Sequence, residues 1–131
     1  MSFGNGIETS VLAKVFGAVD FTPDATYYLA LSQGDPLDDG TGLIEPVNGY
    51  ARVGVANTAG EWVVAGDTAS NVNDITFPAA TGDWGVLTHW AILDASSGGN
   101  VIAHGTLVDV QIPVNGDTFK FFAGDLTIQL D

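Results

Sequence analysis

Two apolar runs on either side of a glycine-rich turn restrict the possible folds more than any other part of the sequence. The run from Val86 to Asp94 alternates between apolar and polar positions over much of its length, and a second run extends from Val101 to Leu107. The segment Ser96–Asn100 between them contains a Gly-Gly-Asn triplet, and these residue types tolerate positive φ angles. The pattern predicts a β-hairpin, and therefore a fold built from sheets.

Most of the chain after Pro23 also has the character of short strands. The expected strands outside the hairpin cover residues 26–32, 50–55, 61–64, 75–77, 108–112, 119–122 and 126–130. Together with the two hairpin strands they form a series of short strands separated by turn signals such as Asn48-Gly49, a spacing typical of a β-sandwich. We expect an all-β sandwich over residues 23–131.

One segment near the start of the chain has the pattern of a helix. Asn5 is placed to cap it, Glu8 follows three residues later as in a capping box, and Gly17 is expected to end it. We expect residues 1–22 to form an N-terminal arm with one short helix, which packs on the core or docks on a neighbouring subunit. Its apolar stripe contains Ile7, Val11, Leu12, Val15 and Phe16.

Length and composition predict one folded domain over residues 1–131. The chain has 131 residues, of which 46% are hydrophobic and 15% charged. A domain of this size buries roughly 68% of the surface of its unfolded chain. Because the sequence contains no cysteine, disulfides and thiolate metal sites are excluded, and stability must come from packing or assembly.

The charge of the chain limits its partners. Sixteen acidic residues outnumber the three basic ones, Lys14, Arg52 and Lys120, for a net charge of -13. Nucleic-acid binding needs several Lys or Arg contacts to phosphates, so we expect no nucleic-acid partner. An acidic membrane surface is disfavoured by the same sign of charge, and we expect no membrane partner. The first residues lack the pattern of a secretory signal, which predicts a protein made and kept in a cytoplasm.

Two groups of side chains are candidate metal ligands. The loop from residue 34 to 48 contains Asp35, Asp38 and Asp39, which could hold calcium or form a solvated acidic loop. The spacing does not match an EF-hand. His89 and His104 lie on the two hairpin strands and could approach one another, so that with Asp94 they could bind zinc; otherwise they are hydrogen-bonded or exposed. The solvated and hydrogen-bonded interpretations are favoured, and no cofactor is expected.

The sequence does not predict an enzyme. No serine lies in a Gly-x-Ser-x-Gly setting, and no nucleophile is paired with an evident base. The acidic residues lie mostly in turns, where a raised pKa of the kind a glycosidase needs is not expected.

Three tryptophans and one arginine are candidate contact residues. Trp90 lies inside a strand pattern and is expected in the core, whereas Trp84 follows a loop and could be buried or anchor a contact. Trp84 or Trp62 could also bind a sugar in a carbohydrate-binding sandwich. Arg52 is expected to pair with one of the many carboxylates, or to contact another subunit.

The order of the motifs resembles that of a widespread family of small tailed-phage virion proteins, often labelled tail-fibre or head-decoration proteins. The similarity covers nearly the whole chain. It rests on the helix that ends near Phe16-Gly17, and on Tyr28–Ser32, Glu45 followed by Gly49–Val53, Ile75–Ala80, Gly82–Gly85, Thr88–Ala95, Ser97–Asn100 and Gly124–Thr127.

The resemblance implies a non-enzymatic building block of a virion, a β-sandwich of jelly-roll type that works as a homotrimer. Because the sequence has no pattern for an elongated shaft, we expect a capsid decoration or cement protein on the outer virion surface, with the major capsid protein as partner. A tail or fibre-tip component that contacts the host is the alternative. The candidate subunit or capsid interface residues are Phe3, Ile7, Val11, Arg52 and Trp84.

Overall fold

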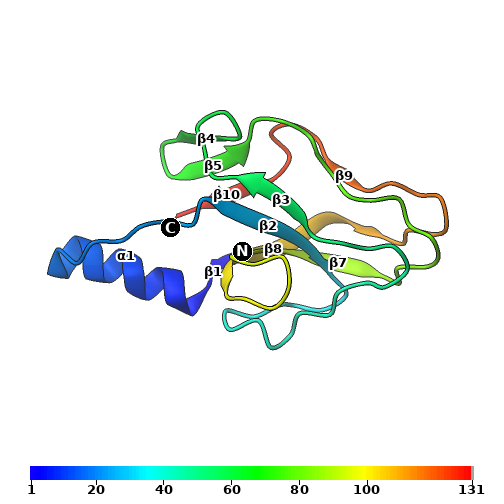
Figure 1. Ribbon diagram of the computed structural model, residues 1–131, viewed down its shortest axis with the longest axis horizontal. Helices are drawn as coiled ribbons and strands as arrows, with labels where there is room; N and C mark the ends of the chain where they lie inside the picture. The colour runs from blue at the N-terminus through cyan, green and yellow to red at the C-terminus, as the bar shows by residue number, and fades with distance from the viewer. Residues whose placement is uncertain (131) are drawn as a thin grey trace.

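A five-stranded antiparallel sheet forms one layer of the protein. The computed structural model describes residues 1–130. The sheet has the order β1-β8-β7-β2-β3. Figure 1 shows its strands in the middle of the molecule, below the segments that contain β4, β5 and β9. The predicted hairpin is confirmed as β7 paired with β8, and Gly98 and Gly99 in its turn have positive φ angles. The strands are β1 (Ser2–Phe3), β2 (Thr26–Ser32), β3 (Val53–Ala56), β7 (Leu87–Leu93) and β8 (Val101–Gln111).

Two smaller antiparallel sheets lie opposite this layer. One has the order β10-β5-β4, and the other pairs β6 with β9. The main core lies between the layers, because its buried residues come from both: Leu29 and Trp90 from the large sheet, and Phe77 and Phe121 from the opposite side. The strands are β4 (Trp62–Ala65), β5 (Thr68–Asn71), β6 (Ile75–Thr76), β9 (Lys120–Phe121) and β10 (Thr127–Gln129).

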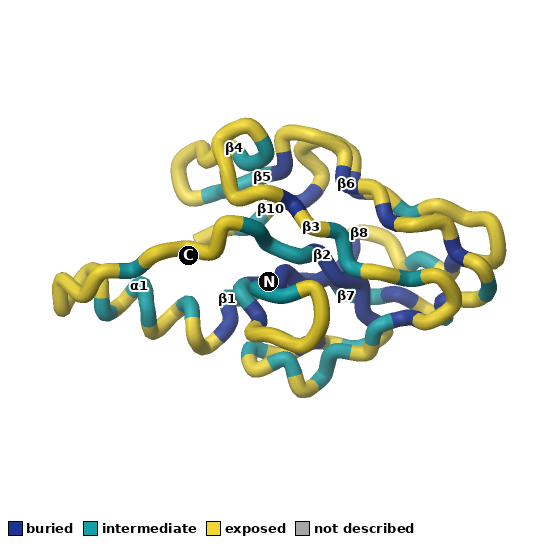
Figure 2. The backbone as a smooth tube through the Cα atoms, in the orientation of Figure 1, coloured by how far each residue is buried: buried dark blue, intermediate teal, exposed yellow. Residues whose placement is uncertain are grey.

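The outer face of the large sheet is covered by the loop between β2 and β3. Ala30, Ala91, Leu93 and Val101 form a second buried cluster, and Leu43 of the loop packs against it. Ala30 lies opposite Ala91, while the neighbouring pair Leu29 and Ile92 faces the main core. Period-two alternation therefore buries both faces of β2 and β7, which Figure 2 shows as the darkest part of the chain.

The only helix of the described residues, α1 (Asn5–Gly17), is joined to the sheet through a close contact at Gly4. The Gly4 N–H donates to the Ile102 carbonyl, and a Cβ at this position would overlap the Val101 carbonyl oxygen. Gly4 is the N-cap and makes no side-chain capping bond, so the prediction that Asn5 caps the helix is wrong. The sheet contact, rather than a capping side chain, determines where the helix starts.

The predicted all-β class with one N-terminal helix is confirmed. The jelly-roll assignment remains a prediction, because the layer opposite the large sheet is divided into ladders of three and two strands. Sequence patterns missed β1, which has two residues, and β5, whose sequence Thr-Ala-Ser-Asn is polar. The predicted strands 101–107 and 108–112 form the single strand β8.

Candidate functional site

The base of α1 contains three of the predicted interface residues. Phe3 pairs with Ala103 of β8, and Ile7 and Val11 follow on the first turns of the helix. All three are partly buried. Phe3 packs against the main core, and Ile7 lines a cavity together with Ile102 and Ala103 of β8, so their apolar surface is only partly free.

The rest of the apolar stripe of α1 has no cover in the described structure. Leu12 is 58% exposed, Val15 65% and Phe16 83%. Figure 1 shows the helix extending away from the sheets, and Figure 2 shows its far end as exposed. The prediction that this stripe packs on the core is therefore wrong for these residues. The helical period was correct, but the helix leaves the domain after its second turn.

Beside the base of α1 lies an open cavity of about 340 Å³, which we call the apolar groove. Of the described residues that line it, Asp67 alone carries a charge. Phe3 and Ile7 form one rim. The Nε1 atom of Trp62 is buried and finds no hydrogen-bond acceptor among residues 1–130. The apolar walls include Tyr27, Trp62, Val64, Ile92, Ile102 and Ile128.

Arg52 links two loops through buried hydrogen bonds. Its side chain is 5% exposed, and its Nε and Nη2 atoms donate to the two oxygens of Glu45 at 2.8 and 2.9 Å. Its Nη1 atom donates to the carbonyls of Ala95 and Gly98, at 2.7 and 2.8 Å. The predicted pairing with a carboxylate is confirmed. Because the guanidinium is occupied inside the protein, its side chain is not an exposed interface group.

The Tyr50 hydroxyl completes this network. It donates to Glu45 Oε1 at 2.8 Å and accepts from the Leu31 N–H at 3.1 Å. Burial raises the pKa of the Tyr50 hydroxyl far above its ordinary value, and the hydrogen bonds from Arg52 to Glu45 raise the pKa of the guanidinium. The network therefore keeps the charge of Arg52 and the proton of Tyr50 at all ordinary pH values, and it ties the β2–β3 loop to the hairpin turn.

Trp84 lies in the core rather than on a surface. Its side chain is 1% exposed, its Nε1 donates to the Asn48 carbonyl at 2.9 Å, and its ring meets that of Tyr50 edge-on. An indole enclosed in this way has no free face for a partner or a sugar, which corrects its proposed role as an interface anchor. Trp90 is 5% exposed, as predicted for a core residue.

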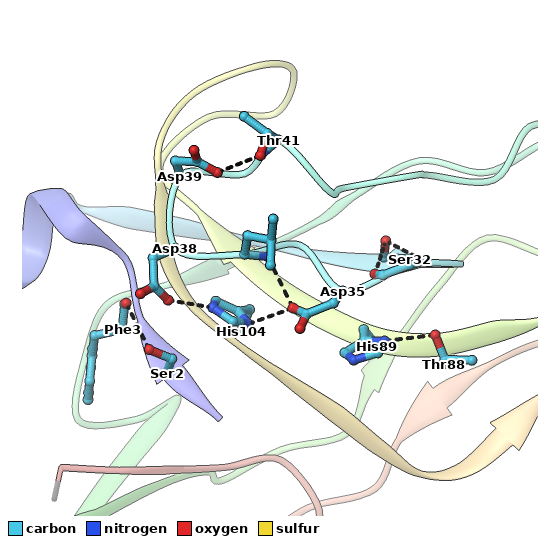
Figure 3. Close-up of polar contacts among 12 residues, drawn as sticks. Ser2, Phe3, Ser32, Asp35, Asp38, Asp39, Thr41, Thr88, His89 and His104 are labelled. Carbon is cyan, nitrogen blue, oxygen red and sulfur yellow. Dashed lines mark hydrogen bonds and ion pairs between the residues drawn. The ribbon is translucent and has the colours of Figure 1, made fainter.

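The acidic loop is held onto the large sheet by His104, as Figure 3 shows. The His104 Nε2 lies 2.8 Å from Asp38 Oδ1, and Nδ1 lies 3.5 Å from Asp35 Oδ1. The hydrogen bond with His104 is the main cause that lowers the pKa of the Asp38 carboxyl below its ordinary value, and Ser2 adds to it. The side chains of Asp35 and Asp38 are nevertheless 54% and 41% exposed, so the loop is solvated, as predicted, and also hydrogen-bonded to the sheet.

The two candidate metal sites are not assembled in the described residues. Asp39 accepts hydrogen bonds from the N–H and hydroxyl of Thr41, and these lower its pKa. The Nδ1 atom of His89 lies 2.7 Å from the Thr88 hydroxyl oxygen, within hydrogen-bond distance. In the β7–β8 pair His89 lies opposite Thr106, whereas His104 lies opposite Ala91. Residues 1–130 contain no group of three or more His, Cys, Asp or Glu side chains placed to hold a metal ion.

Sequence reasoning missed two features of this region. The exposure of Leu12, Val15 and Phe16 could not be found from spacing, because the stripe has the same period whether or not something covers it. The groove walls at Trp62 and Val64 come from a strand pattern whose partner, β5, is polar and gave no signal. No helix among the described residues is both long and apolar enough to cross a membrane.

The model of a family described as podophage GP4 fiber I protein gp80 matches residues 2–129. No curated protein matches the chain.

Proposed function

The chain belongs to the podophage GP4 fiber I protein gp80 family, a family of phage virion structural proteins, and from this premise we propose that it is a subunit of a tail fibre. The observation that carries the proposal is the family match itself, since it covers residues 2–129. In this role the subunit acts by repeated surface contact and does no chemistry, and it works as a homotrimer on the outside of the particle.

Ionisable side chains that are hydrogen-bonded to other residues of the same chain support a passive role. The imidazole of His104 is engaged by Asp38, and the guanidinium of Arg52 is engaged by Glu45. Groups used in this way stiffen the loops that join the strands. A rigid β-sandwich suits a part that must keep its shape while many copies are attached to one particle.

The net charge of -13 supports a place away from packaged DNA. A protein that contacts phosphates neutralises them with Lys and Arg, and this chain has three such residues, of which Arg52 is buried. An acidic protein on the outer surface of the virion avoids electrostatic repulsion from the phosphates of packaged DNA. The subunit would be synthesised in the host cytoplasm before assembly.

A capsid decoration protein that binds the major capsid protein is the second candidate. The shape of the described chain favours this role, because its one helix has only 13 residues and its sheets do not form an elongated shaft. A ligand that binds the assembled shell, but not free capsid subunits, stabilises the shell by mass action. The same protein on a tail would not change the heat resistance of the head.

Labelling of intact particles distinguishes the two candidates. Antibodies raised against the purified chain and coupled to gold should mark the tail region if the protein is a fibre subunit. Gold spread evenly over the head, with heads that resist heating better when the protein is present, would favour decoration and overturn the fibre proposal. Particles that bind no gold at all would contradict both.

A further inference from the structure

We propose that the exposed end of α1 docks into the apolar groove of a second copy of this chain, so that copies are joined in a ring. The inference rests on the proposed role as a repeated virion subunit and identifies the surface through which the copies meet. The donor surface is Leu12, Val15 and Phe16, and the acceptor surface is the apolar groove.

The donor surface cannot be buried within its own subunit. The groove has Phe3 and Ile7 on its rim, so α1 starts beside it and then extends away. A helix rises about 1.5 Å per residue, which places Phe16 roughly 14 Å along the axis from Ile7. The far end of α1 is therefore carried away from the groove of its own chain, while the groove of another copy is free.

Charge favours a second copy as the occupant. Two chains that each carry a charge of -13 repel one another at most points of contact. Residues 5–17 contain one acidic residue, Glu8, and one basic residue, Lys14, so the helix is neutral. The groove adds Asp67 alone among its described lining residues. The donor and acceptor surfaces are thus two regions where identical chains can meet at little electrostatic cost.

The two surfaces also match in chemistry. A foreign partner selected for an acidic protein would present basic groups, yet neither the helix end nor the groove offers an acidic cluster to receive them. Three large apolar side chains that stay in water are instead expected to bury against an apolar surface. Tyr27, Trp62 and Val64 provide such a surface, and Val64 is 72% exposed in the isolated chain.

A contact of this kind can join the copies into a closed ring. Donor and acceptor are different surfaces of one chain, so the contact is head-to-tail, and head-to-tail contacts form rings when the rotation between subunits closes. Each subunit would then take part in two contacts, one as donor and one as acceptor. Three subunits related in this way would give the homotrimer expected for the virion.

Light scattering on the full chain tests the assembly. The wild-type protein should have a mass of at least two times that of the 13.5 kDa monomer, and it should dissociate on dilution. The variant Phe16→Ala keeps a good helix former in α1 but removes the aromatic ring, and it should weaken association by at least about 30-fold. The matched control Val108→Ala changes a side chain that is 95% exposed on β8, and it should associate like wild type.

Cross-linking tests the pairing of the two surfaces, because the natural chain contains no cysteine. One preparation carries Gly17→Cys, at the exposed end of α1 next to the donor surface, and another carries Val64→Cys, and a flexible bismaleimide is added to their mixture. Linked dimers should form in the mixture much faster than in Gly17→Cys mixed with Val108→Cys. Equal rates in the two mixtures, a monomeric wild type, or a Phe16→Ala variant that assembles like wild type would each overturn the proposal.

These results are independent of those that test the function. A monomeric protein whose antibodies still mark the phage tail would refute this interface and leave the fibre role standing. A ring-forming protein whose antibodies mark no part of the particle would refute the fibre role alone.

Discussion

Removal of the Arg52 guanidinium should be among the most damaging single changes outside the apolar core. In Arg52→Met the apolar stem keeps its approximate length, but Glu45 loses both hydrogen bonds from the guanidinium and the positive charge beside it. Truncation of one partner in a buried pair costs about 3–5 kcal/mol. Because the Glu45 side chain is 26% exposed and keeps the hydrogen bond from Tyr50, we expect a loss near the lower limit, about 3 kcal/mol.

Urea denaturation followed by tryptophan fluorescence measures this loss. With a slope of about 2 kcal/mol per molar urea, the midpoint should fall by about 1.5 M while the slope stays constant. The measurement should be made in the Phe16→Ala background, so that assembly adds nothing to the apparent stability. Lys14→Met is the control: Lys14 and Asp20 are 53% and 99% exposed, and loss of their pair should cost less than about 0.5 kcal/mol.

A second change separates the cause of the loss from general damage. If the cost of Arg52→Met comes from a stranded carboxylate, then adding Glu45→Gln should restore part of the stability, since the amide oxygen can still accept from Tyr50. The reasoning is refuted if Arg52→Met costs less than about 1 kcal/mol, or if the double variant is no more stable than Arg52→Met alone.

Three further results are expected. Trp84→Ala should destabilise the fold by about 3–5 kcal/mol in the same urea assay, because a buried indole leaves a cavity, and a loss below about 1 kcal/mol would contradict its core position. Gly105→Ala should cost about 1–3 kcal/mol and change the near-ultraviolet dichroism, because a Cβ there would lie 2.7 Å from Trp90 Cζ2; an unchanged spectrum would contradict that contact. The pKa of Asp38 is lowered in the folded state, so its stabilising effect is fully present above the unfolded pKa of roughly 3.9 and is lost as the pH falls through the folded value. Acid titration of unfolding should therefore show a smaller loss of stability in Asp38→Asn than in wild type, and equal losses would count against the His104 contact.

The hairpin illustrates how much of the fold was predictable. Alternating apolar runs and a turn that tolerates positive φ are local properties, and β7, β8 and Gly98–Gly99 appear where the pattern placed them. The polar strand β5 was missed because its pairing with β4 and β10 comes from neighbours distant in sequence rather than from its own residues.

The candidate site was predictable only in part. Arg52 was expected to find a carboxylate because the chain has many and only one arginine, and Glu45 is that partner. The position of Trp84 could not be decided locally, since a tryptophan after a loop has the same sequence context whether the loop folds inward or outward. The sequence also could not show that Asp38 reaches His104, which is 66 residues away.

The N-terminal helix shows most clearly which features the sequence determines and which depend on the tertiary structure. By itself the sequence determined the all-β class, the single helix and the strong negative charge, because each depends on residue type and on spacing between near neighbours. Only the tertiary structure decided that Leu12, Val15 and Phe16 lie in solvent, that Trp84 is enclosed and that the acidic loop covers the large sheet. Burial depends on which distant segment packs on a surface, and no local period contains that information.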